Sequence, residues 1–241
     1  MSETRDSGRA NVPPRVAIDG PAGAGKSTVA KRLAERLGFL HVDTGAIYRT
    51  VALAAHRAGA SWDDEAKIGD VAEAIVRERR IRMERNESGG AMRVILDDED
   101  VSTAIRTPEM SAGASRVSAI AKVRAALLDL QRQAGAAGGV VLEGRDIGTV
   151  VFPDAEVKLF LTATPEERAQ RRYDELVAKG VSTTYEATLE DQIARDKADT
   201  ERKVAPLRRA DDAVLVDSTG RGIDAVIEEM VRVVQARRRD L

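Results

Sequence analysis

The residues best suited to chemistry lie near the N-terminus, in a segment that reads VAIDGPAGAGKST from Val16 to Thr28. It contains the pattern G-x-x-x-x-G-K-[ST], which predicts a phosphate-binding loop. Backbone N–H groups and the positive end of a helix can surround phosphate oxygens only where no Cβ intervenes, and glycine gives that access. Lys26 is expected to reach the β- and γ-phosphates of a nucleoside triphosphate, and the Ser27 hydroxyl to ligate Mg²⁺. The predicted triphosphate site comprises Gly20, Pro21, Ala22, Gly23, Ala24, Gly25, Lys26, Ser27 and Thr28.

The segments on either side of this loop fit the element order that the pattern requires. The apolar run 16–18 predicts a strand before it. After it, Val29, Leu33 and Leu37 recur every four residues, which predicts a helix with one buried face. A glycine-rich turn that binds nothing is the alternative. The order of strand, loop and helix argues against it.

A second polar segment, DTGAIYR, runs from Asp43 to Arg49. It follows the apolar run 39–42, which predicts another strand. Polar residues just past the carboxyl end of a parallel strand face the ligand crevice of an α/β sheet, so this segment is a candidate second substrate site. The alternative is an ordinary strand-to-helix turn in which Asp43 or Thr44 caps the helix. We interpret His41 as a strand residue rather than a catalyst.

Two strongly charged helices are predicted late in the chain. Pro165 opens the first and Gly180 closes it, while the second covers about 185–199. Both are too polar to belong to the core, and a lid that closes over substrates is expected at such a place. Their charged side chains include Arg168, Arg171, Arg172, Arg195 and Asp199, and Arg202 shares a face with the last two if the second helix continues.

The remaining elements repeat one pattern. Buried strands are predicted at 16–18, 39–42, 140–142, 157–161 and 213–216, and helices separate them. Such alternation predicts a doubly wound α/β fold, with a five-stranded parallel sheet flanked by helices. We expect residues 1–13 to form a disordered tail and residues 14–241 to form a single domain.

One stretch departs from this alternation. Between about Ser61 and Ala114, a charged helical part leads to a predicted hairpin with strands at 81–83 and 92–96 and an acidic extension. We interpret this stretch as an insertion into the fold. A long helix that carries Ser115 and Arg124 is predicted to follow it.

Composition narrows the classes of partner. The 241 residues include 38 Lys and Arg against 40 Asp and Glu, for a formal net charge of -2, so a nucleic acid polymer is not expected as a partner. The absence of cysteine excludes disulfides and thiolate metal sites, which suits a reducing cytosol. No segment has the apolar length of a signal peptide or of a membrane span, so no membrane partner is expected. We expect a soluble, cytoplasmic protein that acts as a monomer.

Five segments in this order resemble the bacterial cytidylate kinases: GPAGAGKST, DTGAIYR, EGRDIGTVVFPDA, EERAQRR and RDKADTER. The resemblance covers about Pro14 to the C-terminus. EGRDIGTVVFPDA is its most specific piece, because many families share the phosphate loop. It implies a P-loop nucleoside-monophosphate kinase fold with a lid at about 165–182 and a small insert in a monophosphate-binding region at about 44–116. Glu143 stands where some relatives have Asp, and its role near Mg²⁺ stays open.

The resemblance also implies an activity: phosphorylation of CMP, and of dCMP, to the diphosphate by ATP with Mg²⁺. The implied catalytic residues are Lys26, Arg49, Arg145 and Arg202, of which the arginines surround the acceptor phosphate. The implied CMP site consists of Thr44, Arg49, Ser115, Arg124, Arg145, Asp146, Arg195, Asp199 and Arg202. In that site Ser115, Arg124 and Asp146 would read the cytosine edge, and Arg195 with Asp199 would meet the ribose. One or more of Arg168, Arg171 and Arg172 would close over the ATP phosphates. An alternative role for Asp146 is to orient Arg145 through an ion pair.

Elementary chemistry agrees with the implied phosphoryl transfer. Both substrates are anions, and the planar guanidinium group of arginine binds phosphate in bidentate geometry. Transfer to an ionised phosphate oxygen requires positioning and charge neutralisation more than acid–base catalysis. Two alternatives stay open: a P-loop kinase for another small acceptor such as UMP or shikimate, and a nucleotide-hydrolysing switch. The sequence contains no N-K-x-D-like segment to read guanine, which argues against the switch.

Overall fold

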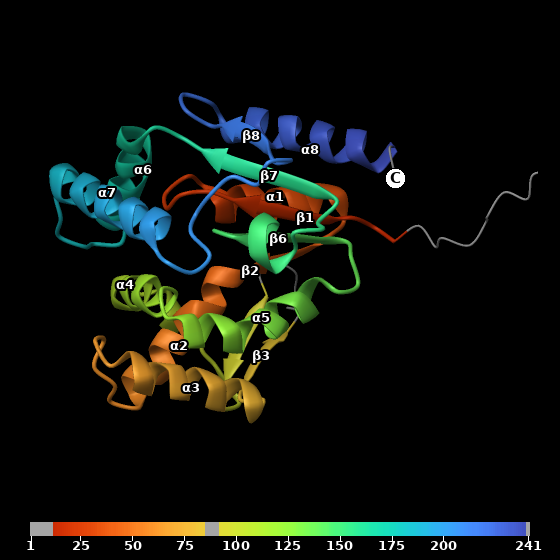
Figure 1. The fold of residues 1–241 in the computed structure, drawn as a ribbon. Coiled ribbons are helices and arrows are strands. Elements are labelled where there is room, and N and C mark those ends of the chain that lie inside the picture. The colour runs from red at the N-terminus through yellow and green to blue at the C-terminus, as the bar shows by residue number, and fades with distance from the viewer. Residues whose placement is uncertain (1–11, 85–91, 240–241) are drawn as a thin grey trace, which may run out of the picture.

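A five-stranded parallel sheet forms the centre of the structure, a computed structural model that describes residues 12–84 and 92–239 (Figure 1). The strands lie in the order β2, β6, β1, β7, β8, and every neighbouring pair runs parallel. Their bounds are β1 Arg15–Asp19, β2 Leu40–Asp43, β6 Val140–Gly144, β7 Val157–Thr162 and β8 Val214–Asp217. The predicted α/β fold with five parallel strands is confirmed. Residues 1–11 of the predicted tail lie outside the described residues.

Helices cover both faces of this sheet because its strands are apolar on both sides. Residues 16–18 of β1 are fully buried, as expected for a parallel strand between two layers. On one face, α1 (Lys26–Leu37) and α8 (Ile223–Arg239) pack against the strands in a shared core. On the other face, the π-helical turn η2 (Ile147–Val151) and Phe152 contribute to a second core. The central strand β1 is therefore held rigidly, and the phosphate loop follows it directly.

The chain between β2 and β6 forms a separate layer that lies below the main sheet in Figure 1. It has its own core, to which Ile47, Ile68 and Leu127 contribute. Its elements are α2 (Thr44–Arg57), α3 (Glu65–Arg77), β3 (Ile81–Glu84), β4 (Arg93–Leu96), β5 (Glu99–Asp100), the 3-10 turn η1 (Ala104–Arg106), α4 (Pro108–Val117) and α5 (Ala121–Gly135). The predicted hairpin is confirmed by the antiparallel pairing of β3 with β4, and its acidic extension adds β5 as a third strand. The turn that joins β3 to β4 lies outside the described residues.

The long helix predicted to carry Ser115 and Arg124 is instead two helices, so that prediction is wrong. Residues 118–120 separate α4 from α5, and Ile120 has an extended backbone (φ -77°, ψ 117°). The Ile120 side chain is nevertheless buried, so the apolar spacing that suggested one helix is satisfied across the break. The break also frees the Ser118 carbonyl, which accepts a hydrogen bond from Arg124 Nη1 at 3.3 Å.

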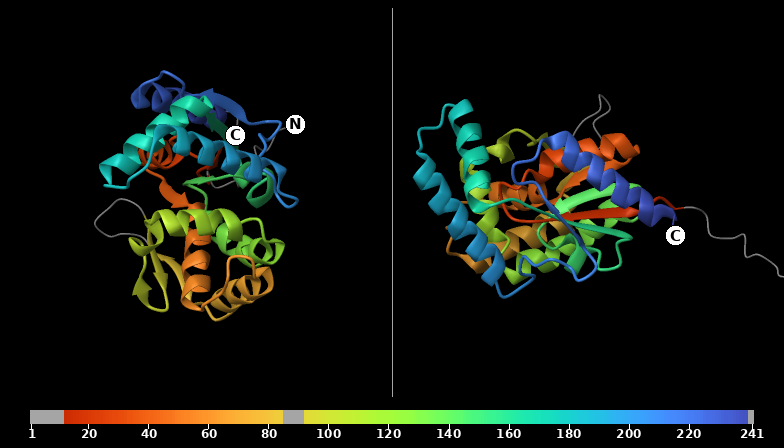
Figure 2. Two further views of the ribbon diagram at one scale, coloured as in Figure 1. Left: turned by 90° about the vertical axis from the view of Figure 1, so that its left-hand side faces the viewer. Right: turned by 90° about the horizontal axis from the view of Figure 1, so that it is seen from above.

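Two charged helices, α6 (Pro165–Ala178) and α7 (Tyr185–Glu201), connect β7 to β8 and pack against each other (Figure 2). The predicted helix pair is confirmed. Because α6 follows β7 directly, the pair stands at the carboxyl end of the sheet. The second helix ends at Glu201, so Arg202 is its C-cap. Across the described part of the chain, no helix is long and apolar enough to cross a membrane.

Candidate active site

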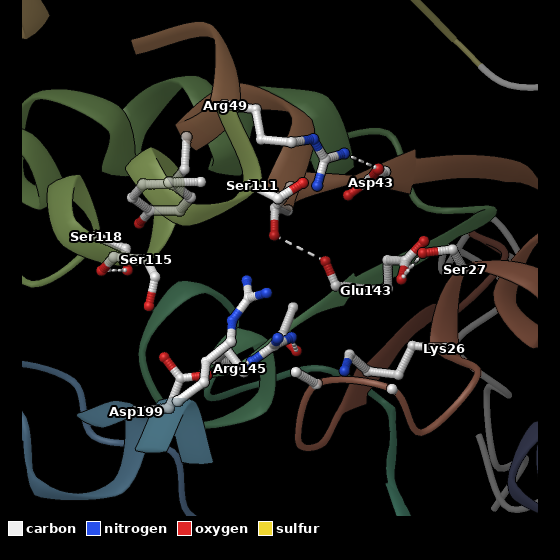
Figure 3. A pocket seen from close by; sticks show the side chains of 18 of the residues that line it. Lys26, Ser27, Asp43, Arg49, Ser111, Ser115, Ser118, Glu143, Arg145 and Asp199 are labelled. Atoms are coloured by element: carbon white, nitrogen blue, oxygen red, sulfur yellow. Dashed lines mark hydrogen bonds and ion pairs between the residues drawn. The ribbon is translucent and has the colours of Figure 1, made fainter. Parts of the chain in front are cut away.

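A cavity of about 590 Å³ opens where the loops after β1, β2 and β6 meet α6 and α7 (Figure 3). It lies at the carboxyl ends of the parallel strands, where ligands bind in open α/β sheets. The predicted site residues that line it are Ala22, Gly23, Gly25, Lys26, Ser27, Thr28, Thr44, Arg49, Ser115, Arg124, Arg145, Asp146, Arg171, Arg172, Arg195, Asp199 and Arg202. Those outside the lining are Gly20, Pro21, Ala24 and Arg168. The phosphate loop and the arginine-bearing segments therefore face one space.

The backbone of the phosphate loop requires glycine. Gly25 is the N-cap of α1 and has a left-handed backbone (φ 88°), which a residue with a Cβ adopts only with strain. A Cβ on Gly20 would lie 2.0 Å from a carbonyl oxygen of β7. Lys26 Nζ donates hydrogen bonds to the carbonyls of Gly20 at 2.7 Å and Pro21 at 2.6 Å. Burial lowers the pKa of Lys26, and the positive charge of Arg145 lowers it further. An anion at this helix N-terminus would favour the charged lysine.

Glu143, near the end of β6, accepts hydrogen bonds at both carboxylate oxygens. Ser27 Oγ lies 2.8 Å from Oε2, and His41 Nε2 lies 2.9 Å from Oε1. Since a carboxylate only accepts, we assign the proton of His41 to Nε2. Ser27 donates its proton to Glu143, so its lone pairs stay available to the cavity. The interpretation of His41 as a strand residue was correct, but it missed this contact.

The oxygen atoms at this corner of the cavity suit Mg²⁺. Ser27 supplies a hydroxyl and Glu143 a carboxylate, both of which are hard oxygen donors. The residues described contain no group of three or more His, Cys, Asp or Glu arranged to hold a metal ion. Mg²⁺ is often held by one or two protein oxygens together with water and substrate phosphates. The donor set fits that mode of binding.

Asp43 both caps α2 and holds Arg49. Its carboxylate accepts a hydrogen bond from the Ala46 N–H at 3.2 Å and another from Arg49 Nη2 at 2.6 Å. Burial raises the pKa of Asp43, but the charge and hydrogen bond of Arg49, together with the charge of Arg106, outweigh burial, and the net pKa is lowered. Asp43 is therefore the helix cap that the alternative interpretation of DTGAIYR expected. The same turn places Arg49 on the wall of the cavity, as Figure 3 shows.

The end of α7 brings Asp199 and Arg195 to the opposite wall. Arg145 Nε donates to Asp199 Oδ2 at 2.8 Å. Arg195 has no salt-bridge partner within the described ranges, and its buried Nε has no hydrogen-bond partner there. Burial and the neighbouring charge of Arg145 lower the pKa of Arg195 to about 10. An anionic ligand would relieve this unfavourable concentration of positive charge.

Asp146 lies between two other arginines. Arg124 forms an ion pair with its Oδ2, and Arg202 Nη2 lies 3.4 Å from its Oδ1. Burial raises the pKa of Asp146 in spite of both guanidinium groups. The alternative in which Asp146 orients Arg145 is wrong, since the ion-pair partner of Arg145 is Asp199.

The three arginines of α6 occupy different environments. Arg168 is buried, donates to the carbonyl of Ala22 at 3.0 Å, and forms an ion pair with Asp196 at 2.6 Å. It therefore joins α6 to α7 and to the phosphate loop. Arg171 and Arg172 line the cavity instead. Arg171 Nη1 lies 3.9 Å from the position of a Cβ built on Gly25, beside the phosphate loop.

Several residues that line the cavity were not predicted from the sequence: Tyr48, Arg106, Ser111, Ser118, Glu175 and Lys179. Tyr48 belongs to the DTGAIYR segment, and its ring lies under the Arg124 guanidinium, 5.5 Å from centroid to carbon. Ser111 precedes Ser115 by four residues in α4, so helical spacing was the available signal. Ser118 lies in the helix break, which the sequence did not predict.

Comparisons with known proteins place this geometry in a family. Residues 16–236 match the family model described as cytidylate kinase. A cytidylate kinase from Syntrophotalea carbinolica is 55% identical over 222 residues, which are 92% of this chain and 92% of that protein. A cytidylate kinase from Geobacter sulfurreducens is 53% identical over 224 residues, covering 93% of this chain and 94% of that protein.

One solved structure adds a likeness of fold alone. It is an uncharacterised protein from Eubacterium ventriosum, 12% identical, with a TM-score of 0.50 and coverage of 92% of this chain and 98% of that chain. The family model and the relatives extend over the phosphate loop, the separate helical layer and the charged helix pair together. The chain belongs to the cytidylate kinase family, with a P-loop kinase fold.

Proposed function

We propose that this chain transfers the γ-phosphoryl group of ATP to CMP and to dCMP, with Mg²⁺, and so forms the diphosphates. The observation that supports this most is that one cavity is lined both by the phosphate loop and by several arginines, among them Arg49, Arg145, Arg195 and Arg202. Lys26 and Arg145 lie close enough for Arg145 to lower the pKa of Lys26. Two phosphate groups between them would offset that repulsion.

The donor side would bind the triphosphate through the backbone of residues 20–28 and through Lys26. Mg²⁺ beside Ser27 would neutralise charge on the phosphate oxygens. Arg171, which lies beside Gly25 of the phosphate loop, and Arg172, which lines the same cavity, are our candidates to close over the ATP phosphates. Arg168 is better suited to hold the helices against the loop, because the carbonyl of Ala22 and the carboxylate of Asp196 already occupy its guanidinium.

The acceptor side would hold the monophosphate between Arg49, Arg145 and Arg202. An oxygen of that phosphate forms the new bond to the γ-phosphorus, and the bond from the γ-phosphorus to the β-bridging oxygen breaks as ADP leaves. The attacking oxygen is already ionised, so no general base is needed. Catalysis then rests on fixed positive charges and on in-line placement of the two phosphates.

The base and the sugar would lie in the same cavity. Asp146 and Ser115 can accept a hydrogen bond from the cytosine amino group, and Arg124 can donate to its ring nitrogen and carbonyl. Arg195 and Asp199 are the candidates to meet the ribose, from the end of α7. Because both sugar forms present a 3′-hydroxyl, we include dCMP among the acceptors.

A monophosphate panel tests the proposal. The purified chain is assayed with Mg-ATP and CMP, dCMP, UMP, AMP, shikimate or no acceptor, and both ADP and the phosphorylated product are measured. We expect product with CMP and dCMP at far higher kcat/KM than with the other acceptors. ATP hydrolysis that is independent of any acceptor would support a hydrolysing switch instead. A preference for UMP or shikimate would assign the chain to another acceptor.

A further inference from the structure

His41 is a buried polar side chain to which the reaction as described gives no role. Its side chain is 8% exposed, and Nε2 lies 2.9 Å from Glu143 Oε1. The other ring nitrogen, Nδ1, is buried without a hydrogen-bond partner among the residues described. A side chain that only filled space here could be apolar and would leave no polar atom unsatisfied. The contact between Nε2 and Glu143 accounts for a histidine at this position.

The strand geometry explains why this contact forms. In the parallel pairing of β2 with β6, Asp43 is opposite Glu143, and His41 is two residues earlier on the same side of β2. Val42 and Leu142 point into the core on the other face of the sheet. The side chains of His41 and Glu143 therefore lie on the face that carries α1, where Ser27 completes the set. Three separate elements supply one continuous chain of hydrogen bonds, of which Figure 3 draws the Ser27–Glu143 part.

We propose that His41 is a positioning residue for the Mg²⁺ that accompanies the nucleotide, an inference that rests on the proposed function. With one oxygen fixed by His41, the Glu143 carboxylate presents the other to the Ser27 proton. Ser27 then directs its lone pairs toward the cavity, where the cation is expected. Without the His41 contact, the carboxylate could rotate and the hydroxyl could donate elsewhere. Substitution of a residue that hydrogen-bonds to a metal ligand and orients it commonly lowers metal affinity by roughly 10–100-fold.

The test measures nucleotide binding with and without the metal. Isothermal titration calorimetry gives the Kd of adenylyl imidodiphosphate, an ATP analogue that does not transfer its phosphoryl group, in Mg²⁺ and in EDTA. For His41→Leu we expect the ratio of the Kd in EDTA to the Kd in Mg²⁺ to fall about 10-fold, with little change in the Kd measured in EDTA. We call this ratio the metal effect. In the kinase assay, the Mg²⁺ concentration for half-maximal rate should rise while the KM for CMP stays near the wild-type value.

Two polar variants separate positioning from packing. The amide nitrogen of Gln reaches about as far from the backbone as Nε2, so His41→Gln should restore most of the metal effect. The amide nitrogen of Asn corresponds to Nδ1 and falls short of Glu143, so His41→Asn should behave like His41→Leu. The chain offers a matched control in His56, its only other histidine, which is exposed on α2. His56→Leu should leave both Kd values unchanged.

The outcomes are distinct. If the Gln, Asn and Leu variants show the wild-type metal effect, or lose affinity equally in Mg²⁺ and EDTA, the positioning role is wrong. If His41→Leu does not fold, the contrast between Gln and Asn still decides. If the wild-type protein itself binds no nucleotide and shows no dependence on Mg²⁺, the proposed function fails rather than the role of His41.

Discussion

Arg145 Nε lies 2.8 Å from Asp199 Oδ2, so a residue just after β6 is tied to the last turn of α7. Burial alone would raise the pKa of Asp199, but the charge and hydrogen bond of Arg145 lower it. The carboxylate is therefore ionised at neutral pH, and the contact is a charged one between the sheet and the charged helix pair. The C-terminal end of α7 is therefore anchored to the core. Among the described residues, no ion pair joins the turn between α6 and α7 to the core.

This anchoring predicts how α6 and α7 respond to substrates. Hydrogen exchange over residues 165–199 should slow when CMP and adenylyl imidodiphosphate are both bound, because the helices close and exclude water. The smallest change is expected near Asp199, which is already fixed. Mass spectrometry of peptic fragments measures this, with α8 as an internal reference. The same exchange in free and doubly liganded protein would indicate a static surface.

Lys26→Ala tests the phosphate loop. Removal of a fixed charge aimed at the transferring phosphate should lower kcat by ~10²-fold or more, while the fold survives. Lys31→Ala is the matched control, since Lys31 is an exposed lysine of the same helix. Stopped assays of diphosphate formation, with circular dichroism for the fold, give the answer. Near-normal turnover in Lys26→Ala would remove the loop from the mechanism.

Arg49→Lys tests the acceptor wall. The lysine keeps the charge but loses the planar fork, which donates to Asp43 and in the proposed site would also bind a phosphate. We expect a higher KM for CMP and a nearly unchanged Kd for ATP. Arg57→Lys, at the exposed end of the same helix, is the control. A loss of ATP affinity with an unchanged KM for CMP would mean that the two phosphate sites are assigned the wrong way round.

The sequence predicts the frame of the fold because its signals are local. Each β strand of the main sheet is a short apolar run, and the phosphate loop is a pattern that contains its own glycines. The break between α4 and α5 was not predictable in this way. Val117 and Ile120 keep helical spacing in the sequence, and only the buried packing of Ile120 and the contact from Arg124 to the Ser118 carbonyl show that the helix stops.

Pairings within the site also depend on tertiary structure. The resemblance implies that Arg145, Asp146 and Asp199 belong to one site, but the alternative that paired Arg145 with Asp146 is wrong. Neighbours in sequence point in different directions here, so Asp146 meets Arg124 and Arg202 from other elements. The contact between His41 and Glu143 is of the same kind, because it requires β2 to lie beside β6 although about a hundred residues separate them.

Asp19 predicts a specific dependence of stability on pH. It accepts hydrogen bonds from the N–H groups of Ile147 and Gly148, each at 2.8 Å, yet burial raises its pKa from 3.8 to about 6. Between these two values the folded state binds more protons than the unfolded state. The contribution of this group to the free energy of unfolding therefore falls as pH rises from about 4 to 6, by up to about 3 kcal/mol.

Asp19→Asn cannot titrate, so it isolates this contribution. Urea unfolding at several pH values gives the difference in the free energy of unfolding between wild type and variant. The free energy of unfolding of the wild type minus that of the variant should fall across pH 4 to 6 and be flat above about pH 7. Asp63→Asn, at an exposed position, is the control and should show no such change. A difference that rises over the same interval would contradict the raised pKa of Asp19.

Asp146→Asn tests whether Asp146 gives the proposed preference for cytosine over uracil. Cytosine carries an amino donor at C4, whereas uracil places a carbonyl oxygen there and an N–H at N3. The carboxylate of Asp146 would face the uracil oxygen, so a buried polar group would lose its partner at a cost of ~1–3 kcal/mol, or roughly 5- to 150-fold in discrimination. An amide can donate to that oxygen. The ratio of kcat/KM for CMP to that for UMP should therefore fall in the variant.

The competing explanation is that Asp146 serves only to hold Arg124 and Arg202, with which it forms ion pairs. In that case Asp146→Asn acts chiefly through Arg202, which would bind the phosphate that CMP and UMP share, and activity on both falls by the same factor. Asp154→Asn, an exposed position near the end of the same segment, controls for general effects of the substitution. Because the two explanations differ in a ratio rather than in total activity, partial loss of folded enzyme does not obscure the result. An unchanged CMP-to-UMP ratio in the variant would exclude base readout by Asp146.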